Sequence, residues 1–180
     1  MNDDDKGRAP PGSVAAVRAL ACALLYACAV APALALAGDL AGPEFGAGSV
    51  QLAAIAQAGP LNMASIDQLG PGQRAQLTQD GAGNRLDVWQ SGGYGNTVTA
   101  WQQGVANSAQ LSQSGAHHEL VLDQRGDANV ANIAQHGIER HALIEQFGNN
   151  NRVDLVQGPS SPAVFLRQSG DNNVATLIQH

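Results

Sequence analysis

The chain has 180 residues and a formal net charge of −6, with 9 Lys and Arg against 15 Asp and Glu, and 44% of its residues are hydrophobic. This acidic balance argues against nucleic acid as a partner, because phosphate binding needs clustered basic side chains. Both cysteines, Cys22 and Cys28, lie in the N-terminal segment, so we expect no disulfide and no Cys metal site beyond it. The length leaves room for one repeat domain and no second one.

Residues 1–37 have the pattern of a secretory signal peptide. Basic side chains precede an apolar stretch over residues 19–30, and Ala35-Leu36-Ala37 fits a small-residue cleavage site. The apolar stretch is too short and too rich in Ala for a membrane span. We therefore expect cleavage between Ala37 and Gly38. Residues 38–50 then form a lead without periodicity, either a linker or an export-recognition tail.

From residue 51 onward a glutamine recurs every eleven residues, with one step of twelve. The positions four and two residues before each glutamine are aliphatic in all twelve copies. At 44% hydrophobic residues, such a match has a chance probability of about 10⁻⁹, so the segment is a repeat array. The glutamines are Gln57, Gln68, Gln79, Gln90, Gln102, Gln113, Gln124, Gln135, Gln146, Gln157, Gln168 and Gln179.

The repeats form pairs, because the residue six before the glutamine is Asn in every second copy. These asparagines are Asn62, Asn84, Asn107, Asn129, Asn151 and Asn173. The alternate copies carry Gln51, Gln73, Asn96, His118, Arg140 and Pro162 at the same position. The unit is therefore about 22 residues long. The domain 51–180 divides into units of about 51–70, 73–92, 96–115, 118–137, 140–159 and 162–180.

Alternation with period two over seven residues, as in Asn129–Gln135, predicts a strand with one buried face. A tight arc should follow each strand, since glycine stands two residues after ten of the glutamines and adopts positive φ easily. These turn glycines are Gly59, Gly70, Gly81, Gly92, Gly104, Gly115, Gly126, Gly137, Gly148 and Gly170. The three glycines of Ser91–Gly95 can absorb the step of twelve. Two strands and two arcs per unit predict an all-β solenoid with twelve short strands in two parallel sheets, about 4.8 Å between coils.

Stacked coils place identical amide side chains above one another, where they can hydrogen-bond along the stack. A buried Gln without such a partner would cost about 1–3 kcal/mol, so we expect the twelve glutamines and the six paired asparagines to form a fibre-core ladder. We expect His118 and Arg140 to lie at a strand corner and reach solvent. Both solenoid ends are predicted to be uncapped, with the last ladder intact, and an open strand edge is a template for another chain. The predicted function is therefore polymerisation.

These residues resemble curlin repeats, the building units of curli fibres on bacterial surfaces. The family pattern S-x5-Q-x4-N-x5-Q is matched in its last three positions by Gln57-x4-Asn62-x5-Gln68 and by Gln124-x4-Asn129-x5-Gln135. The leading Ser is replaced throughout. The resemblance implies a secreted, amyloid-forming structural subunit of a cell-surface fibre (pilus) for adhesion and biofilm. Its implied partners are itself, other curlin subunits and the outer-membrane curli secretion and assembly machinery.

Curli contain a major subunit and a minor subunit that nucleates the fibre and is held at the surface. The minor type is favoured because the lead lacks Gly/Asn richness and because His118, Arg140 and Pro162 interrupt one column; a major subunit remains the alternative. Apolar outward positions gather in the C-terminal half, where they predict docking to a partner or the outer membrane, or lateral fibre packing. This candidate stripe comprises Val121, Leu143, Phe165, Val156 and Ile178.

Other classes of solenoid fit less well. A calcium-binding β-roll needs nine-residue units with stacked Asp, and an ice-binding solenoid needs Thr-x-Thr on successive coils, whereas only Thr97-x-Thr99 occurs here. The histidines do not converge, so we expect no catalytic residue, no metal site and no cofactor. A monomeric secreted adhesin with the same fold is the remaining alternative from another class.

Overall fold

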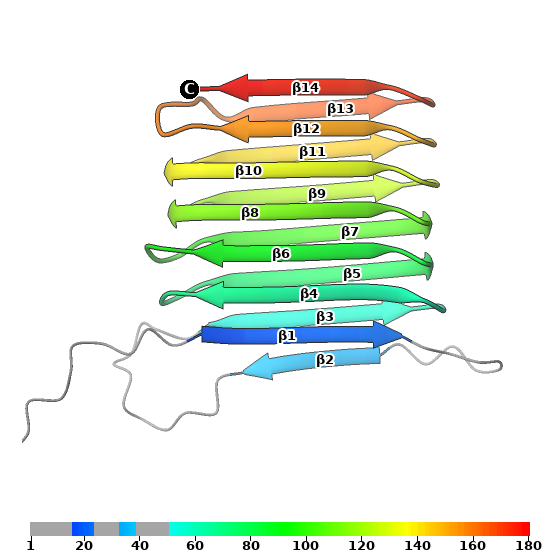
Figure 1. Ribbon diagram of the computed structural model, residues 1–180, viewed down its shortest axis with the longest axis horizontal. Coiled ribbons are helices and arrows are strands. Elements are labelled where there is room, and N and C mark those ends of the chain that lie inside the picture. The colour runs from blue at the N-terminus through cyan, green and yellow to red at the C-terminus, as the bar shows by residue number, and fades with distance from the viewer. Residues whose placement is uncertain (1–15, 24–32, 39–50) are drawn as a thin grey trace, which may run out of the picture.

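The computed structural model describes residues 16–23, 33–38 and 51–180 and is all-β. Two seven-stranded sheets lie face to face, and the chain alternates between them as it climbs from coil to coil (Figure 1). Within the described ranges no helix is present that is long and apolar enough to cross a membrane. The predicted β-solenoid is confirmed, with its odd arms in one parallel sheet and its even arms in the other.

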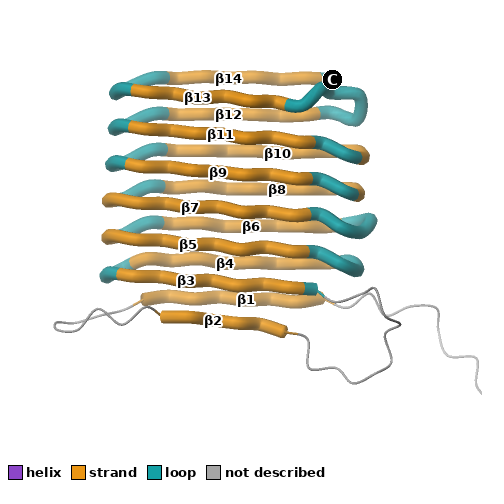
Figure 2. Tube along the Cα trace, turned by 180° about the vertical axis from the view of Figure 1, so that it is seen from behind, coloured by secondary structure: helices purple, strands orange, loops and turns teal. Residues whose placement is uncertain are grey.

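Each sheet stacks its strands in chain order. Sheet A comprises β1 (Ala16–Ala23), β4 (Asn62–Leu69), β6 (Arg85–Ser91), β8 (Ser108–Ala116), β10 (Val130–Ile138), β12 (Arg152–Gln157) and β14 (Val174–Gln179). Sheet B comprises β2 (Ala33–Gly38), β3 (Leu52–Ala58), β5 (Arg74–Ala82), β7 (Thr97–Val105), β9 (Glu119–Arg125), β11 (His141–Phe147) and β13 (Val164–Ser169). Figure 2 shows both stacks from behind, with the arcs at their two edges.

The register of every parallel pair follows the repeat. Glutamine lies beside glutamine from coil to coil, as in Gln113, Gln135 and Gln157 on β8, β10 and β12. The step of twelve leaves this register intact, because Gln90 still lies beside Gln113 and Arg74 beside Thr97. The extra residue is taken up between Ser91 and Thr97, where the three glycines all have positive φ.

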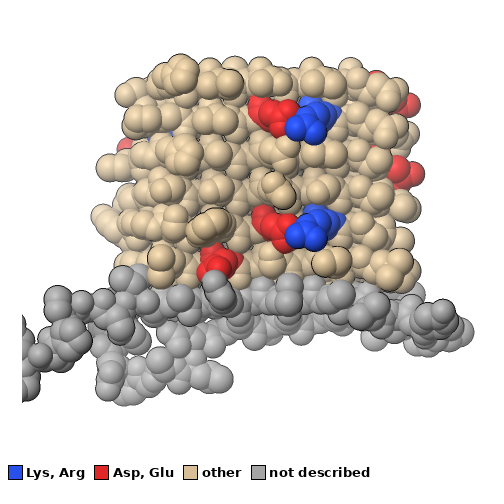
Figure 3. Space-filling model, in the orientation of Figure 1, with Lys and Arg blue, Asp and Glu red and all other residues tan. Residues whose placement is uncertain are grey.

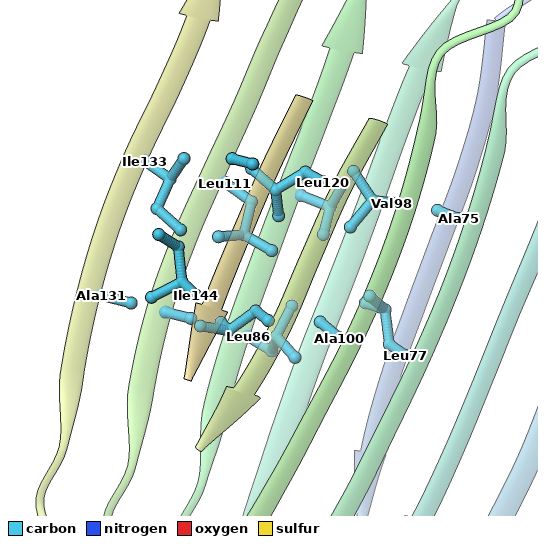
Figure 4. Close-up of a cluster of buried hydrophobic side chains, with 14 of the residues drawn as sticks. Ala75, Leu77, Leu86, Val98, Ala100, Leu111, Leu120, Ala131, Ile133 and Ile144 are labelled. Carbon is cyan, nitrogen blue, oxygen red and sulfur yellow. The ribbon is translucent and has the colours of Figure 1, made fainter. Parts of the chain in front are cut away.

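The core lies between the sheets and consists of the predicted aliphatic positions. Ile55, Leu86, Leu120 and Val153 are fully shielded from solvent. Figure 4 shows such side chains from both sheets meeting in the narrow space between them. Each coil contributes only four small aliphatic groups, so its burial depends on the coils above and below.

The strands β5, β7, β8 and β10 have nine residues each and extend further than the seven-residue pattern predicts. β7 ends at Val105 and β8 begins at Ser108, because the glycine arcs themselves pair with the arcs of the next coil. Gly115 shows how closely they approach: a Cβ built on it would lie 1.8 Å from the carbonyl oxygen of Gly137. With φ at +128°, this position requires glycine both for its conformation and for this contact.

The expectation that both ends of the mature chain are uncapped stays a prediction, because segments before the predicted cleavage site cover the N-terminal end in this structure. β1 pairs antiparallel with β4, and β2 pairs antiparallel with β3, so the first coil has neighbours on both sides. Without a neighbour, the outer edges of β3 and β4 would carry unpaired N–H and C=O groups, and an extended segment can pair with them. The predicted signal peptide and lead lie largely outside the described residues, and the predicted cleavage stays a prediction.

Candidate assembly site

Two ladders of glutamine run through the interior and share one direction. In sheet B, Nε2 of each glutamine donates to Oε1 of the glutamine one coil closer to the C-terminus, as from Gln102 to Gln124 (2.8 Å) and from Gln146 to Gln168 (2.9 Å). The same Nε2 also reaches a backbone carbonyl across the core, for example that of Arg85. All of these side chains are buried, so the amides satisfy one another away from water.

The asparagine ladder runs in the opposite direction. Oδ1 of Asn107 accepts from both N and Nδ2 of Asn129, the asparagine one coil further along, at 3.0 and 3.1 Å. Nδ2 of Asn107 donates to the carbonyl of Gly126 in the next arc at 2.7 Å. Each asparagine therefore forms hydrogen bonds within its own arc and with the coils before and after it. These bonds explain why asparagine recurs at this corner.

A second corner carries an equivalent column that the sequence pattern does not assign to the ladder. Nε2 of Gln73 donates to the carbonyl of Gly92, and Nδ2 of Asn96 donates to that of Gly115. The backbone N–H of Asn96 in turn donates to Oε1 of the Gln73 amide. These side chains are buried like the asparagines of the first corner. The recurrence of Gln, Gln and Asn six residues before the odd-arm glutamines is the signal that could have revealed this column.

The expectation that His118 reaches solvent is wrong, since its exposed fraction is 1%. Its ring replaces an asparagine amide: Nδ1 accepts from the backbone N–H of Arg140 at 3.1 Å, and Nε2 donates to the carbonyl of Ser114 at 3.2 Å. This geometry requires the neutral ring with its proton on Nε2. Burial lowers the pKa of His118, the bond to Ser114 opposes this effect, and Arg140 and His136 add to the lowering. Arg140 itself is half-buried, so its expected exposure holds only in part.

The last coil departs from the ladder. β14 pairs with β12 in the regular register, but Nε2 of Gln157 donates to the carbonyl of Pro162 at 2.9 Å. Among the described residues Oε1 of Gln179 accepts no hydrogen bond. The ladder that sequence reasoning expects to be intact at Gln179 is therefore broken there. The arc through Gly158 and Pro162, which is wider than the others in Figure 1, brings the proline carbonyl to the glutamine.

The two ends of the stack present complementary groups. At the N-terminal end, Oε1 of Gln57 and of Gln68 accepts no hydrogen bond from the described residues. At the C-terminal end, no described strand lies beyond β13 and β14. There Nε2 of Gln168 donates to the carbonyl of Arg152, whereas each earlier glutamine of sheet B also donates to a further glutamine. In the glutamine ladders the free acceptors thus face the N-terminal end and the donors face the C-terminal end, whereas the asparagine ladder has the reverse polarity.

The outward residues of the predicted stripe lie on opposite faces. Val121, Leu143 and Phe165 form a column on sheet B, where only Phe165 is largely exposed, at 67%. Val156 and Ile178 lie side by side on sheet A. Beside the sheet B column, the Arg125 guanidinium lies 5.5 Å from the ring centres of both Trp101 and Phe147, an arrangement that stabilises exposed rings.

With this geometry in view, one comparison with known proteins is informative. Residues 119–158 match the family model of the curlin-associated repeat. This segment holds β9 to β12, two successive coils of the solenoid. The match supports the curlin family for the chain, a family of structural rather than enzymatic repeats. Comparison with curated proteins and with solved structures gives no match.

The matched segment and the residue just before it include both a regular and an irregular column. Asn129 and Asn151 form the regular corner, whereas His118 and Arg140 occupy the other. In this chain the second corner thus accommodates His118 and Arg140, because the His118 ring accepts from the Arg140 backbone N–H. Sequence reasoning found a resemblance to curlin repeats but expected these two residues to reach solvent.

Proposed function

We propose that the chain is a secreted subunit of a curli-type extracellular fibre on the bacterial surface and that it polymerises by strand addition at the ends of the solenoid. The curlin repeat and the β-solenoid are consistent with a structural subunit of this kind. The observation that carries the proposal is the complementarity of the two ends, because it allows one copy to continue the ladders of another.

The continuation is specific at the level of atoms. Nε2 of Gln168 in one copy would donate to Oε1 of Gln57 in the next, as Gln146 donates to Gln168 within the chain. Oδ1 of Asn173 would accept from the backbone N–H of Asn62, as Oδ1 of Asn151 accepts from that of Asn173. β13 and β14 would then pair in parallel with β3 and β4. Such a head-to-tail contact does not close on itself and generates a filament.

The leader regulates this contact in the proposal. In the full chain β2 and β1 cover the strands β3 and β4 that the next copy must reach. Cleavage after Ala37 would remove all of β1 and all of β2 except Gly38, and would open the N-terminal end. Growth is therefore expected only after export through the outer-membrane assembly machinery, which we propose as a partner together with other curlin subunits.

A fibre-growth assay tests the proposal on the chain that begins at Gly38. Thioflavin fluorescence should rise after a lag, and preformed fibres should shorten this lag. The double substitution Gln57→Ala and Asn62→Ala should lengthen the lag, because the end coil loses its acceptor and its arc bonds. Gln76→Ala, on the exposed face of β5, is the matched control. A chain that stays monomeric would support the monomeric adhesin, and an unchanged lag in the double variant would exclude the end coil as template.

Within this function we propose the minor, nucleating role. The support is the irregular second corner and the weakly joined last coil, which suit a subunit that starts a fibre better than one that repeats through it. The test is seeding of a more regular curlin subunit by a small molar fraction of this chain. Acceleration of the regular subunit supports nucleation, whereas growth of this chain only with itself supports the major role.

A further inference from the structure

A hollow of about 700 Å³ crosses the outer face of sheet A over β4, β6, β8 and β10. The register explains its origin. Trp89 is followed in its column by Ser112 and Ala134, two small side chains, and then by Val156. The large indole therefore stands beside a gap two strands wide, and 61% of its surface is exposed.

The wall next to this gap is polar but carries little free charge. Asp87 accepts from Ser65 at 2.6 Å and pairs with Arg85 at 2.8 Å, while Asn132 donates to Asp154 at 2.7 Å. Gln110 lies between Asp87 and Asn132 in the register. Its exposed amide makes no hydrogen bond within the described part of the chain, so both a donor and an acceptor face the hollow.

Figure 3 shows the same face, where acidic and basic side chains occupy a few adjoining patches and the rest is uncharged. No basic side chain lines the hollow, whereas Asp67 and Asp87 do. Phosphate, sulfate or carboxylate groups would therefore meet repulsion. A lipid chain would meet hydroxyl and amide groups it cannot satisfy, and a peptide strand would find no open sheet edge on this face.

We propose that this hollow binds a neutral polysaccharide, with one sugar ring stacked on Trp89. The C–H face of a pyranose ring is apolar and weakly positive, which suits the negative face of an indole. The hydroxyl groups at the ring edge match the neighbouring Gln110, Ser112 and Asn132. The hollow spans three strand spacings, about 14 Å, which gives a short run of sugar units room along the solenoid axis.

The site lies on the side of the solenoid and away from both ends. It stays exposed when coils stack end to end, so a fibre would carry it once per subunit. The inference needs the fold of residues 51–180 and does not depend on whether the chain polymerises. Loss of fibre growth and loss of sugar binding are therefore separable results.

Isothermal titration calorimetry with maltohexaose, cellohexaose and xylohexaose, and with an oligogalacturonate as an acidic comparison, tests the site on the full chain. At least one neutral hexasaccharide should bind with saturation, and Trp89→Ala should weaken it at least tenfold. The matched control is Trp101→Ala on sheet B, because Trp101 is also exposed but lies beside Asp123 and under Arg125. Gln110→Ala should weaken binding several-fold, and Trp89→Phe should retain most of it.

Circular dichroism of each variant controls for folding, which the exposed position of Trp89 should leave unchanged. Three results would overturn the proposal: no saturable binding of any neutral hexasaccharide, equal losses in the Trp89 and Trp101 variants, or tighter binding of the acidic oligosaccharide. The last of these would show that charge rather than ring stacking governs the face.

Discussion

Acidification should weaken the solenoid at the junction between its fourth and fifth coils, through His118. Its Nδ1 must remain unprotonated to accept from the N–H of Arg140, and its ring is buried. Besides burial, Arg140 on the arc before β11 and His136 on β10 lower the pKa of His118 and so oppose a second proton. Glu119, the next residue after His118 and the first of β9, is engaged with His141 of β11 at 3.3 Å.

The sign of the effect follows from the lowered pKa of His118. The unfolded chain binds a proton at the usual value of 6.5, whereas the folded chain does so only at lower pH. Stability is therefore complete above pH 6.5 and falls as the pH drops below it. While the folded ring stays neutral the loss is about 1.4 kcal/mol per pH unit, so at pH 5.5 it should reach at most about 1.4 kcal/mol.

Urea unfolding of the chain at pH 7.5 and at pH 5.5 measures this loss. His118→Asn places at this corner the residue type found at Asn96 and should remove most of the pH dependence. His117→Asn, one residue earlier and exposed, is the control and should keep it. The reasoning fails if wild type and His118→Asn lose the same stability between the two pH values, because the dependence would then arise elsewhere.

Three further predictions concern the stack itself. Gln135→Ala should cost about 3–5 kcal/mol in urea unfolding, since Gln135 both accepts and donates in the buried ladder, whereas Gln110→Ala on the exposed face should cost under about 0.5 kcal/mol. Gly115→Ala should unfold the chain or lower its melting temperature far more than Gly83→Ala: both have positive φ, but only at Gly115 would the Cβ meet the carbonyl oxygen of the next arc. Truncation after Gln157 should release the protein from cells, measured as shed against cell-bound protein, and equal retention would contradict an anchoring role for the last coil. Fibre growth should stay largely intact, because β11 and β12 would then form the end and Gln146 would present the donor that Gln168 presents in the uncut chain.

The fold could be predicted because two independent periods agree. The aliphatic positions fix which face of each strand is buried, and the spacing from Gln124 to Gln135 and Gln146 fixes which strands are neighbours. In a parallel stack each residue then lies beside the residue at the equivalent repeat position one coil away. Register, core and ladder follow from that single rule, without any knowledge of side-chain contacts.

The second corner could not be predicted by the same rule, because its column changes residue type at every coil after Gln73. His118 can be buried because its ring accepts from the backbone N–H of Arg140 in the next coil. This contact depends on how the coils stack, and the sequence of one strand does not reveal it. The break at Gln157 has a similar origin: its amide has a choice between Gln179 and the carbonyl of Pro162, and only the path of the wider arc decides it. The pairing of β1 with β4 joins segments outside the repeat, where no periodicity constrains the partner.

These departures from the repeat are also where the chain acquires properties that a uniform array lacks. A stack of identical coils has the same stability at every level and the same chemistry along each face. His118, in place of an asparagine-type corner residue, makes one contact between coils dependent on pH. Trp89, followed in its column by two small side chains, leaves a hollow on the face of sheet A. Among the described residues the Oε1 of Gln179 accepts no hydrogen bond, so the last coil lacks one ladder bond while the backbone pairing of β12 with β14 is kept. Because each coil contacts only its neighbours, such changes stay local, and the remaining ladders can still guide the addition of another copy.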